Sequence, residues 1–172
     1  MIKIVKEKLA DADEVEVLLD LVFGLGRETL GSYRLRDGVK RIDELCYTLR
    51  DDFGVLVGVI RFWPVFLGSQ KHKALLLGPL GVHPTRQGEG LGKLLIDTSI
   101  NKAKEIGWTR VILIGDLAYY KQFGFSKKFV KNIFLNDKNS SFRILGRELI
   151  LGSMSDLKGP IFRYAGGITY HK

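Results

Sequence analysis

The sequence has a single cysteine, four prolines and no long hydrophobic run. Because Cys46 stands alone, the chain cannot form an internal disulfide, which is typical of proteins from reducing compartments. No stretch approaches the roughly 18 consecutive apolar residues that a membrane helix needs. The first residues are charged and lack the apolar segment of a secretory signal. We therefore expect a cytoplasmic protein that does not contact a membrane.

Acidic residues are also few, with 19 Asp and Glu against 27 Lys and Arg. The excess is greatest over residues 121–150, where seven Lys and Arg accompany only Asp137 and Glu148. Such a segment is typical of a solvated face, or of a surface that attracts a phosphorylated cofactor or an acidic partner. Nucleic acid is the weaker interpretation, because aromatic residues are not interleaved with the basic ones in any recognised pattern.

A length of 172 residues suits one buried core, so we expect a single domain over residues 1–172. Apolar spacing after Asp11 predicts an amphipathic helix that ends near residues 24–26, with Glu14 completing a capping box. The other predicted elements are a hairpin over 44–64, a central strand over 74–82, a helix over 91–106, a strand over 109–114, a short helix over 116–122, and strands at 129–135 and 148–151. This order predicts an α/β protein with a mixed sheet flanked by helices.

The central strand, ALLLGPLGV at residues 74–82, contains no charged side chain. A run this apolar is typical of a strand that is buried on both faces. Its Gly78-Pro79 pair predicts an interruption, because proline donates no ladder hydrogen bond and glycine within a strand often marks a bulge. We expect this break to open a cleft toward the strand at residues 109–114.

The stretch HPTRQGEGLGKLL follows, and it places Gly88, Gly90 and Gly92 at the start of the next helix. A helix start presents unpaired N–H groups, and glycines let an anionic group approach the backbone closely. Two common phosphate-binding motifs do not fit this stretch. A P-loop needs glycine at position 87 and a hydroxyl at 94, where Gln87 and Leu94 stand, and the glycine spacing also misses G-x-G-x-x-G.

A third pattern fits. Gln87, Gly90 and Gly92 form Q-x-x-G-x-G, which resembles the acyl-CoA-binding signature of the GCN5-related N-acetyltransferase (GNAT) family. Farther along, YYKQFGF is similar to the family's Y-x-x-x-G-F pattern, with Tyr120 at the position of an acid tyrosine. The resemblance covers about residues 1–135 and is most specific between residues 74 and 125. Within the family the sequence looks like the YhbS-type branch of acetyltransferases.

This resemblance implies a mostly antiparallel sheet with a split between the fourth and fifth strands. It also implies that acetyl-CoA is the cosubstrate and that an amine, on a small molecule or a protein, attacks its thioester directly in a ternary complex. No metal is expected, and the resemblance is compatible with a homodimer. Tyr120 would protonate the departing thiolate, whereas Tyr119, on another helical face, should tolerate loss of its hydroxyl. The implied cofactor-binding residues are Leu80, Gly81, Val82, His83, Gln87, Gly88, Glu89, Gly90, Leu91, Gly92 and Lys93.

The sequence names no general base, because the central strand lacks the glutamate that many family members place there. His83 is more typical of a polar strand end at the cofactor rim, Asp116 of a helix cap, and Cys46 of a core residue. A water chain or a backbone carbonyl is therefore the expected base. The alternatives to an enzyme are a non-catalytic acyl-CoA-binding regulatory module, which could dispense with Tyr120, and a basic nucleic-acid-binding protein.

Overall fold

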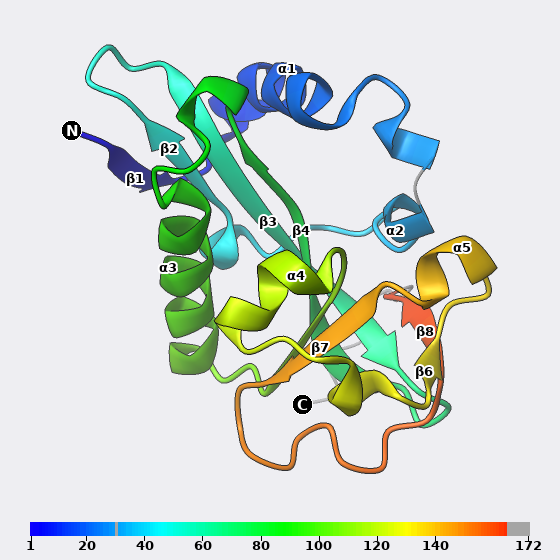
Figure 1. Ribbon diagram of the computed structural model, residues 1–172. Coiled ribbons are helices and arrows are strands. Elements are labelled where there is room, and N and C mark those ends of the chain that lie inside the picture. The colour runs from blue at the N-terminus through cyan, green and yellow to red at the C-terminus, as the bar shows by residue number, and fades with distance from the viewer. Residues whose placement is uncertain (30, 165–172) are drawn as a thin grey trace.

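The computed structural model describes residues 1–29 and 31–164. Within these residues eight strands form one sheet, and short 3₁₀ turns join several elements (Figure 1). The strands are β1 (Lys3–Lys6), β2 (Tyr47–Arg50), β3 (Leu56–Leu67), β4 (His72–Val82), β5 (Arg110–Ile114), β6 (Ile133–Phe134), β7 (Ile144–Glu148) and β8 (Gly159–Arg163). The helices are α1 (Ala12–Phe23), α2 (Gly31–Arg34), α3 (Leu91–Glu105), α4 (Leu117–Tyr120) and α5 (Lys138–Ser141). In this described part of the chain, no helix is both long and apolar enough to cross a membrane.

The main path of the sheet runs in the order β1-β2-β3-β4-β5-β7. The pairs along it are antiparallel except β4 with β5. Off this path, β8 pairs antiparallel with the far end of β3 and parallel with the short β6. The predicted mixed, mostly antiparallel sheet flanked by helices is therefore confirmed.

The sheet splits between β4 and β5. These two strands pair over only two residues each, at the start of β4. Immediately afterwards β4 bulges, because Gly78 and Pro79 together face Arg61 of β3. Residues 80–82 then have no strand on their β5 side within the described chain. The predicted interruption at Gly78-Pro79 and the predicted split are confirmed.

Two helices cover opposite faces of the sheet near this split. Neighbouring residues of β3 point to opposite faces, so Val59 packs with the apolar stripe of α1 and Ile60 joins the larger core under α3. In Figure 1, α3 runs along one side of the sheet and α1 lies across its upper end. The predicted helix over residues 91–106 agrees with α3, which ends at Glu105.

The first helix begins where the sequence predicts, but without the predicted capping box. The Asp11 carboxylate accepts hydrogen bonds from the Lys8 N–H and from Arg50, both at 2.8 Å. Glu14 also accepts from Arg50 at 2.8 Å. Because Arg50 lies in β2, a tertiary ion pair draws both carboxylates away from the helix end, and the local cap does not form.

Beyond residue 125 the predicted strands are displaced. Lys127–Val130 form a 3₁₀ turn, so only a small part of the predicted strand at 129–135 is extended, as β6. β7 ends at Glu148, where a strand over 148–151 is predicted to begin, and β8 has no counterpart in the prediction. The reason is that β7 and β8 are positioned by pairing with β5 and β3, which lie far away in the sequence.

Candidate active site

The candidate site begins at the free edge of β4. The His83 N–H donates to the Val57 carbonyl at 2.9 Å, so the backbone groups of residues 81 and 83 point toward β3. By the same alternation the backbone groups of Leu80 and Val82 point toward the split. In agreement, the Val82 carbonyl accepts a hydrogen bond from the Gln87 side chain at 3.3 Å. This part of β4 therefore offers backbone donors and acceptors to a bound molecule.

A glycine-rich turn leads from β4 into α3. His83 Nδ1 lies 2.8 Å from Thr85 Oγ1 and 3.3 Å from its backbone nitrogen, which caps the 3₁₀ turn Pro84–Arg86. Gly90 then adopts a left-handed φ of 78° directly before α3, and a Cβ at this position would meet no atom within 4 Å. The first N–H groups of α3, which have no partner within the helix, are therefore reached through open space.

Gly92, in the first turn of α3, lies beneath the hydroxyl of Tyr119. A Cβ at position 92 would overlap that hydroxyl, so a larger residue would displace the tyrosine. The contact joins α3 to α4. It therefore places the glycine-rich turn beside the YYKQFGF segment, so the two sequence motifs are neighbours in the fold.

A cleft of about 790 Å³ runs between these elements. Residues of β4, the glycine-rich turn, α3 and α4 line it, together with residues near α2. Eight of the predicted cofactor-binding residues lie in this lining: Leu80, Val82, Gln87, Gly88, Gly90, Leu91, Gly92 and Lys93.

The other three predicted residues, Gly81, His83 and Glu89, lie beside the cleft rather than in its lining. Gly81 faces α1, where a Cβ would lie 3.2 Å from Leu19. The His83 ring is engaged with Thr85, and Glu89 accepts two hydrogen bonds from Arg86 at 2.8 and 2.9 Å. The side chains of His83 and Glu89 therefore stabilise the turn.

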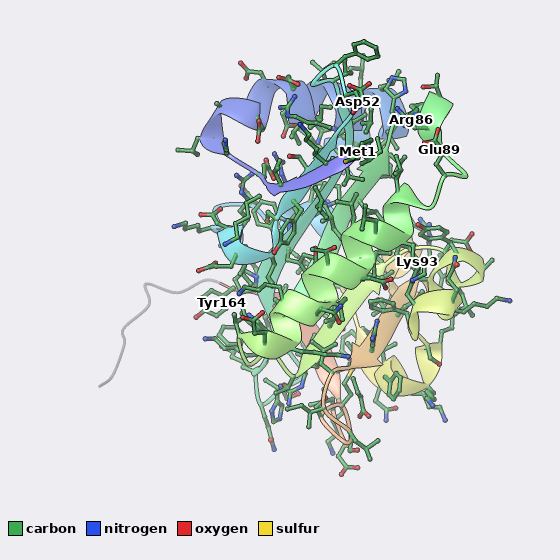
Figure 2. The ribbon with its side chains drawn as sticks, turned by 90° about the vertical axis from the view of Figure 1, so that its left-hand side faces the viewer. Met1, Asp52, Arg86, Glu89, Lys93 and Tyr164 are labelled. Carbon is green, nitrogen blue, oxygen red and sulfur yellow. The ribbon has the colours of Figure 1, made fainter. Side chains whose placement is uncertain are left out.

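The cations next to the turn are already paired with carboxylates. Figure 2 shows Arg86 and Glu89 side by side before α3, with Lys93 on its first turn. Lys93 forms an ion pair with Asp97, one turn farther along the helix. Because these cations are partly neutralised, the free N–H groups and the dipole of α3 are the main anion-binding feature at this end of the cleft.

Tyr120 ends α4 and lines the cleft. Its ring packs edge-on against Phe125, with 5.9 Å between ring centres, and against Gly115. Its hydroxyl has no hydrogen-bond partner in the part of the chain that the structure describes. Burial, and secondarily Tyr119, raise the pKa of Tyr120 above its ordinary value of 10, so the phenol stays protonated at neutral pH.

Tyr119 lines the same cleft, which differs from the prediction. Its ring centre lies 4.9 Å from that of Tyr120, and the rings are nearly perpendicular at 83°. The reason is that α4 is a single turn held against Gly92, so both tyrosines are directed toward the split. Tyr119 is therefore not a neutral comparison for Tyr120.

The lining of the cleft contains one carboxylate, Asp116, among the described residues. Asp116 accepts from the Ala118 N–H at 3.0 Å and so caps α4, which confirms the predicted cap. Cys46 lies in the core as predicted, and burial raises the pKa of its thiol to about 12. Nowhere in residues 1–29 and 31–164 do three potential metal ligands of the His, Cys, Asp or Glu type gather.

Sequence reasoning missed several lining residues, among them the polar residues Ser32, Arg36 and Arg143. Ser32 and Arg36 come from residues 27–40, where the apolar pattern is too weak to place an element. Arg143 comes from the basic segment, whose net charge is the one signal that points to it. The other two carry no local signal, because their position depends on where α2 packs.

Comparison with known proteins agrees with this geometry. The sequence matches the model of the Acetyltransferase (GNAT) family over residues 13–125. It is 32% identical over 75 residues to the uncharacterized N-acetyltransferase YhbS of Escherichia coli strain K12, a stretch that covers 44% of this chain and 45% of YhbS. It is 27% identical over 121 residues to N-acetyltransferase family 8 member 3 of Rattus norvegicus, covering 66% of this chain and 53% of that protein. The matched stretches thus span about half the length of these curated relatives.

Solved structures show the same fold. The E. coli GNAT family N-acetyltransferase YhbS in complex with CoA superposes with a TM-score of 0.78 at 23% identity, covering 94% of this chain and 87% of that one. A GNAT family acetyltransferase from Brucella melitensis in complex with acetyl-CoA gives 0.68 at 24% identity, covering 96% and 97%. The family match over residues 13–125 includes the open edge of β4, the glycine-rich turn and the tyrosine helix, and the chain belongs to the acetyltransferase (GNAT) family.

Proposed function

We propose that this protein transfers an acetyl group from acetyl-CoA to a primary amine by direct attack in a ternary complex. One observation carries the proposal: a single cleft joins the free N-terminus of α3, the open edge of β4 and the Tyr120 hydroxyl. A helix N-terminus suits a pyrophosphate, an open strand edge suits an amide-rich chain, and a protonated phenol suits a departing thiolate. The complexes of two fold relatives with CoA and acetyl-CoA support this assignment.

Two surfaces of the cleft would bind different parts of CoA. The N–H groups around residues 87–92 would hold the pyrophosphate, since Gly88 and Gly90 leave the backbone open. The outward backbone groups of Leu80 and Val82 would pair with the amides of the pantetheine arm. Both surfaces fix the thioester carbon in place before the amine arrives, which is the orientation that a bimolecular attack needs.

In the transfer itself the amine nitrogen bonds to the thioester carbonyl carbon, and the bond between carbon and sulfur breaks. The thiolate that leaves takes the proton of the Tyr120 hydroxyl. The proton lost by the amine passes to water, because the single carboxylate in the described lining, Asp116, is engaged as a helix cap, and the Tyr120 phenolate regains a proton from that water. We also propose that residues 1–172 act as one acyltransferase domain, since β1 and β8 belong to the same sheet.

The test is a pair of glycine substitutions at the two ends of α3. Gly90→Val places a branched side chain at a φ of 78° beside the pyrophosphate site and should weaken CoA binding at least about tenfold. Gly107→Val is the matched control, because its φ of 96° imposes similar strain and its Cβ also meets no atom within 4 Å. The affinity of both variants for CoA is measured by calorimetric titration. Equal affinities for CoA would refute the assignment of the turn.

A second measurement separates catalysis from binding alone. Thiol release from acetyl-CoA is followed with a panel of primary amines. We expect turnover with at least one class of amine. Tight CoA binding without turnover on any amine would instead favour a regulatory module that senses acyl-CoA.

A further inference from the structure

Arg36 occupies the end of the cleft that lies away from the glycine-rich turn. It follows α2 in the chain, and a Cβ on Gly78 would lie 3.0 Å from its Nη2 atom. Figure 1 shows α2 and α3 on opposite sides of α4. Arg36 is thus a basic group of the cleft lining that lies beside the bulge of β4, where the thioester would lie under the proposed function.

The guanidinium of Arg36 is held by aromatic rings rather than by carboxylates. Its central carbon lies 4.5 Å from the ring centre of Tyr33 and 6.0 Å from that of Trp63. Both rings are fixed in turn, since the Tyr33 hydroxyl accepts from Arg27 at 2.6 Å and the Trp63 indole N–H donates to the Gly78 carbonyl at 2.6 Å. Arg36 is therefore oriented in advance without being neutralised.

Two of the three nitrogens of this guanidinium have no hydrogen-bond partner among the described residues. Nε and Nη1 of Arg36 are shielded from solvent and make no hydrogen bond to any described residue, and no described carboxylate forms an ion pair with Arg36. Burial, opposed by Tyr33 and reinforced by Arg61 and Arg27, lowers the pKa of Arg36 to about 10, so the side chain stays charged at neutral pH. A shielded, unpaired charge is costly to the fold, which is the situation expected where a ligand supplies the missing partner.

The pyrophosphate of CoA is not that partner. Val82 lies four residue steps along the strand from Gly78, which is roughly 13 Å, and the glycine-rich turn lies beyond Val82. An anion held at the start of α3 therefore does not reach Arg36. The group that Arg36 binds must belong to the other reactant.

We propose that the acceptor is an amine that also carries a carboxylate, as amino acids do, and that Arg36 binds this carboxylate through its Nη2 atom, which lies beside Gly78. This inference rests on the proposed acetyl transfer. Ser32 and Arg143, which line the cleft, add a hydroxyl and a second positive charge. Because Asp116 is the one carboxylate in the described lining, the same site disfavours acceptors with several positive charges, such as polyamines.

The test uses pairs of amines that differ in one group. Each pair contains an amino acid and its carboxamide, for example 4-aminobutanoate with 4-aminobutanamide, along with α-amino acids and their amides and one polyamine. Thiol release from acetyl-CoA is measured at one pH. We expect kcat/KM for the preferred acid to exceed that of its amide by about ten- to a hundredfold, as for a charge-assisted hydrogen bond. Equal values within every pair, or preference for the polyamine, would overturn the proposal.

Substitution then assigns the preference to one residue. Arg36→Gln should raise KM for the acid by about ten- to a hundredfold, leave the values for the amide nearly unchanged, and so remove the discrimination. Arg36→Lys should restore only part of it, because an ammonium lacks the planar fork. Arg34→Gln is the matched control, since Arg34 is an exposed residue of α2 outside the lining of the cleft. An unchanged acid-to-amide ratio in Arg36→Gln would refute the role of Arg36.

The outcome remains decisive if no amine in the panel is turned over. Calorimetry on CoA-saturated protein then compares binding of each acid with its amide, in the wild type and in Arg36→Gln. Binding of acids that depends on Arg36 supports the subsite even where the transfer fails, and absence of any acid preference refutes it. Loss of CoA binding itself would count against the proposed function instead, so the two failures are distinguishable.

Discussion

Arg61 and Arg36 both lie near the bulge of β4, and their surroundings are opposite. Arg61, in β3 across from the bulge, donates to both carboxylate oxygens of Glu7 at 2.6 to 3.2 Å and to Glu16 at 3.0 Å. The Glu7 side chain is completely shielded from solvent. Arg36 has aromatic neighbours and no carboxylate in the described chain. One arginine therefore completes an ion-pair network and the other is left without a partner.

The difference separates two uses of buried charge. The network of Glu7, Arg61, Glu16 and Arg27 joins the end of β1, α1 and β3, and removing Arg61 leaves the fully shielded Glu7 carboxylate with Arg41 as its remaining partner. Arg36 contributes no comparable pairing, so the fold gains little from its charge. Groups that carry function are often retained at some expense of stability, whereas fully paired groups serve the structure. The same contrast holds for tyrosines, since Tyr33 accepts a hydrogen bond and Tyr120 has no partner among the described residues.

The largest expected effect tests whether an unpartnered group is functional. Tyr120→Phe removes a proton donor and almost no contact area, so kcat should fall by about 10² to 10⁴-fold while CoA affinity stays nearly constant. Tyr164→Phe is the control, because Tyr164 stacks on Phe66 and lies well away from the glycine-rich turn (Figure 2). Turnover of Tyr120→Phe at the wild-type rate, with chemistry limiting, would mean that solvent supplies the proton.

Substituting each arginine by methionine compares their contributions to stability directly. Arg61→Met leaves the buried Glu7 carboxylate with Arg41 as its remaining partner and should lower the free energy of unfolding by about 3 kcal/mol, the lower end of the cost of breaking a buried ion pair. Arg36→Met should leave the free energy of unfolding unchanged or raise it. The reason is that the shielded charge disappears and an apolar side chain packs against Tyr33 and Trp63. Urea unfolding measures both variants. If Arg36→Met were as destabilising as Arg61→Met, Arg36 would be a structural residue.

A smaller effect is expected at the support of the bulge. Trp63→Phe removes the indole N–H that donates to the Gly78 carbonyl and should lower the free energy of unfolding by about 0.5–1.5 kcal/mol. Trp108→Phe is the matched control, since its indole N–H has no partner in the described part of the chain. Trp63 also flanks Arg36. Trp63→Phe, unlike Trp108→Phe, should therefore reduce the preference for an acid over its amide. Equal discrimination in the two tryptophan variants would show that Trp63 does not orient Arg36.

The smallest effect concerns the pH dependence of the paired network. Burial alone would raise the pKa of Glu16, but hydrogen bonds from Arg27 and Arg61 outweigh it and hold the pKa below the usual 4.5. A carboxylate with a lowered pKa stabilises the fold fully above about pH 4.5, and that contribution is lost as the pH falls through its folded value. The free energy of unfolding is measured for the wild type and for Glu16→Gln between pH 7 and pH 3. It should fall less with decreasing pH in the variant than in the wild type. Identical pH profiles would exclude a contribution from Glu16.

The backbone geometry at the glycine-rich end of the cleft was predictable because its signals are local. Gly90 needs a left-handed backbone, Gly92 needs room for Tyr119, and both requirements are visible in the glycine spacing. The Gly78-Pro79 pair likewise predicts the bulge from two adjacent residues. The capping box at Asp11 is a local signal that failed, since Arg50 of β2 takes both carboxylates. Local patterns are therefore reliable here only where no distant partner competes.

The sequence by itself determined the mixed sheet, its interruption, the glycine-rich helix start and the family, because hydrophobic period, turn chemistry and motif spacing act over a few residues. The tertiary structure alone decided that β8 extends β3, that both tyrosines of α4 face the cleft, and that Arg36 reaches the bulge while Arg61 is paired. These arrangements depend on the packing of segments far apart in the chain. A buried charge is neutralised only if folding brings an opposite charge next to it. That partner can lie far away in the sequence, so no local pattern predicts it.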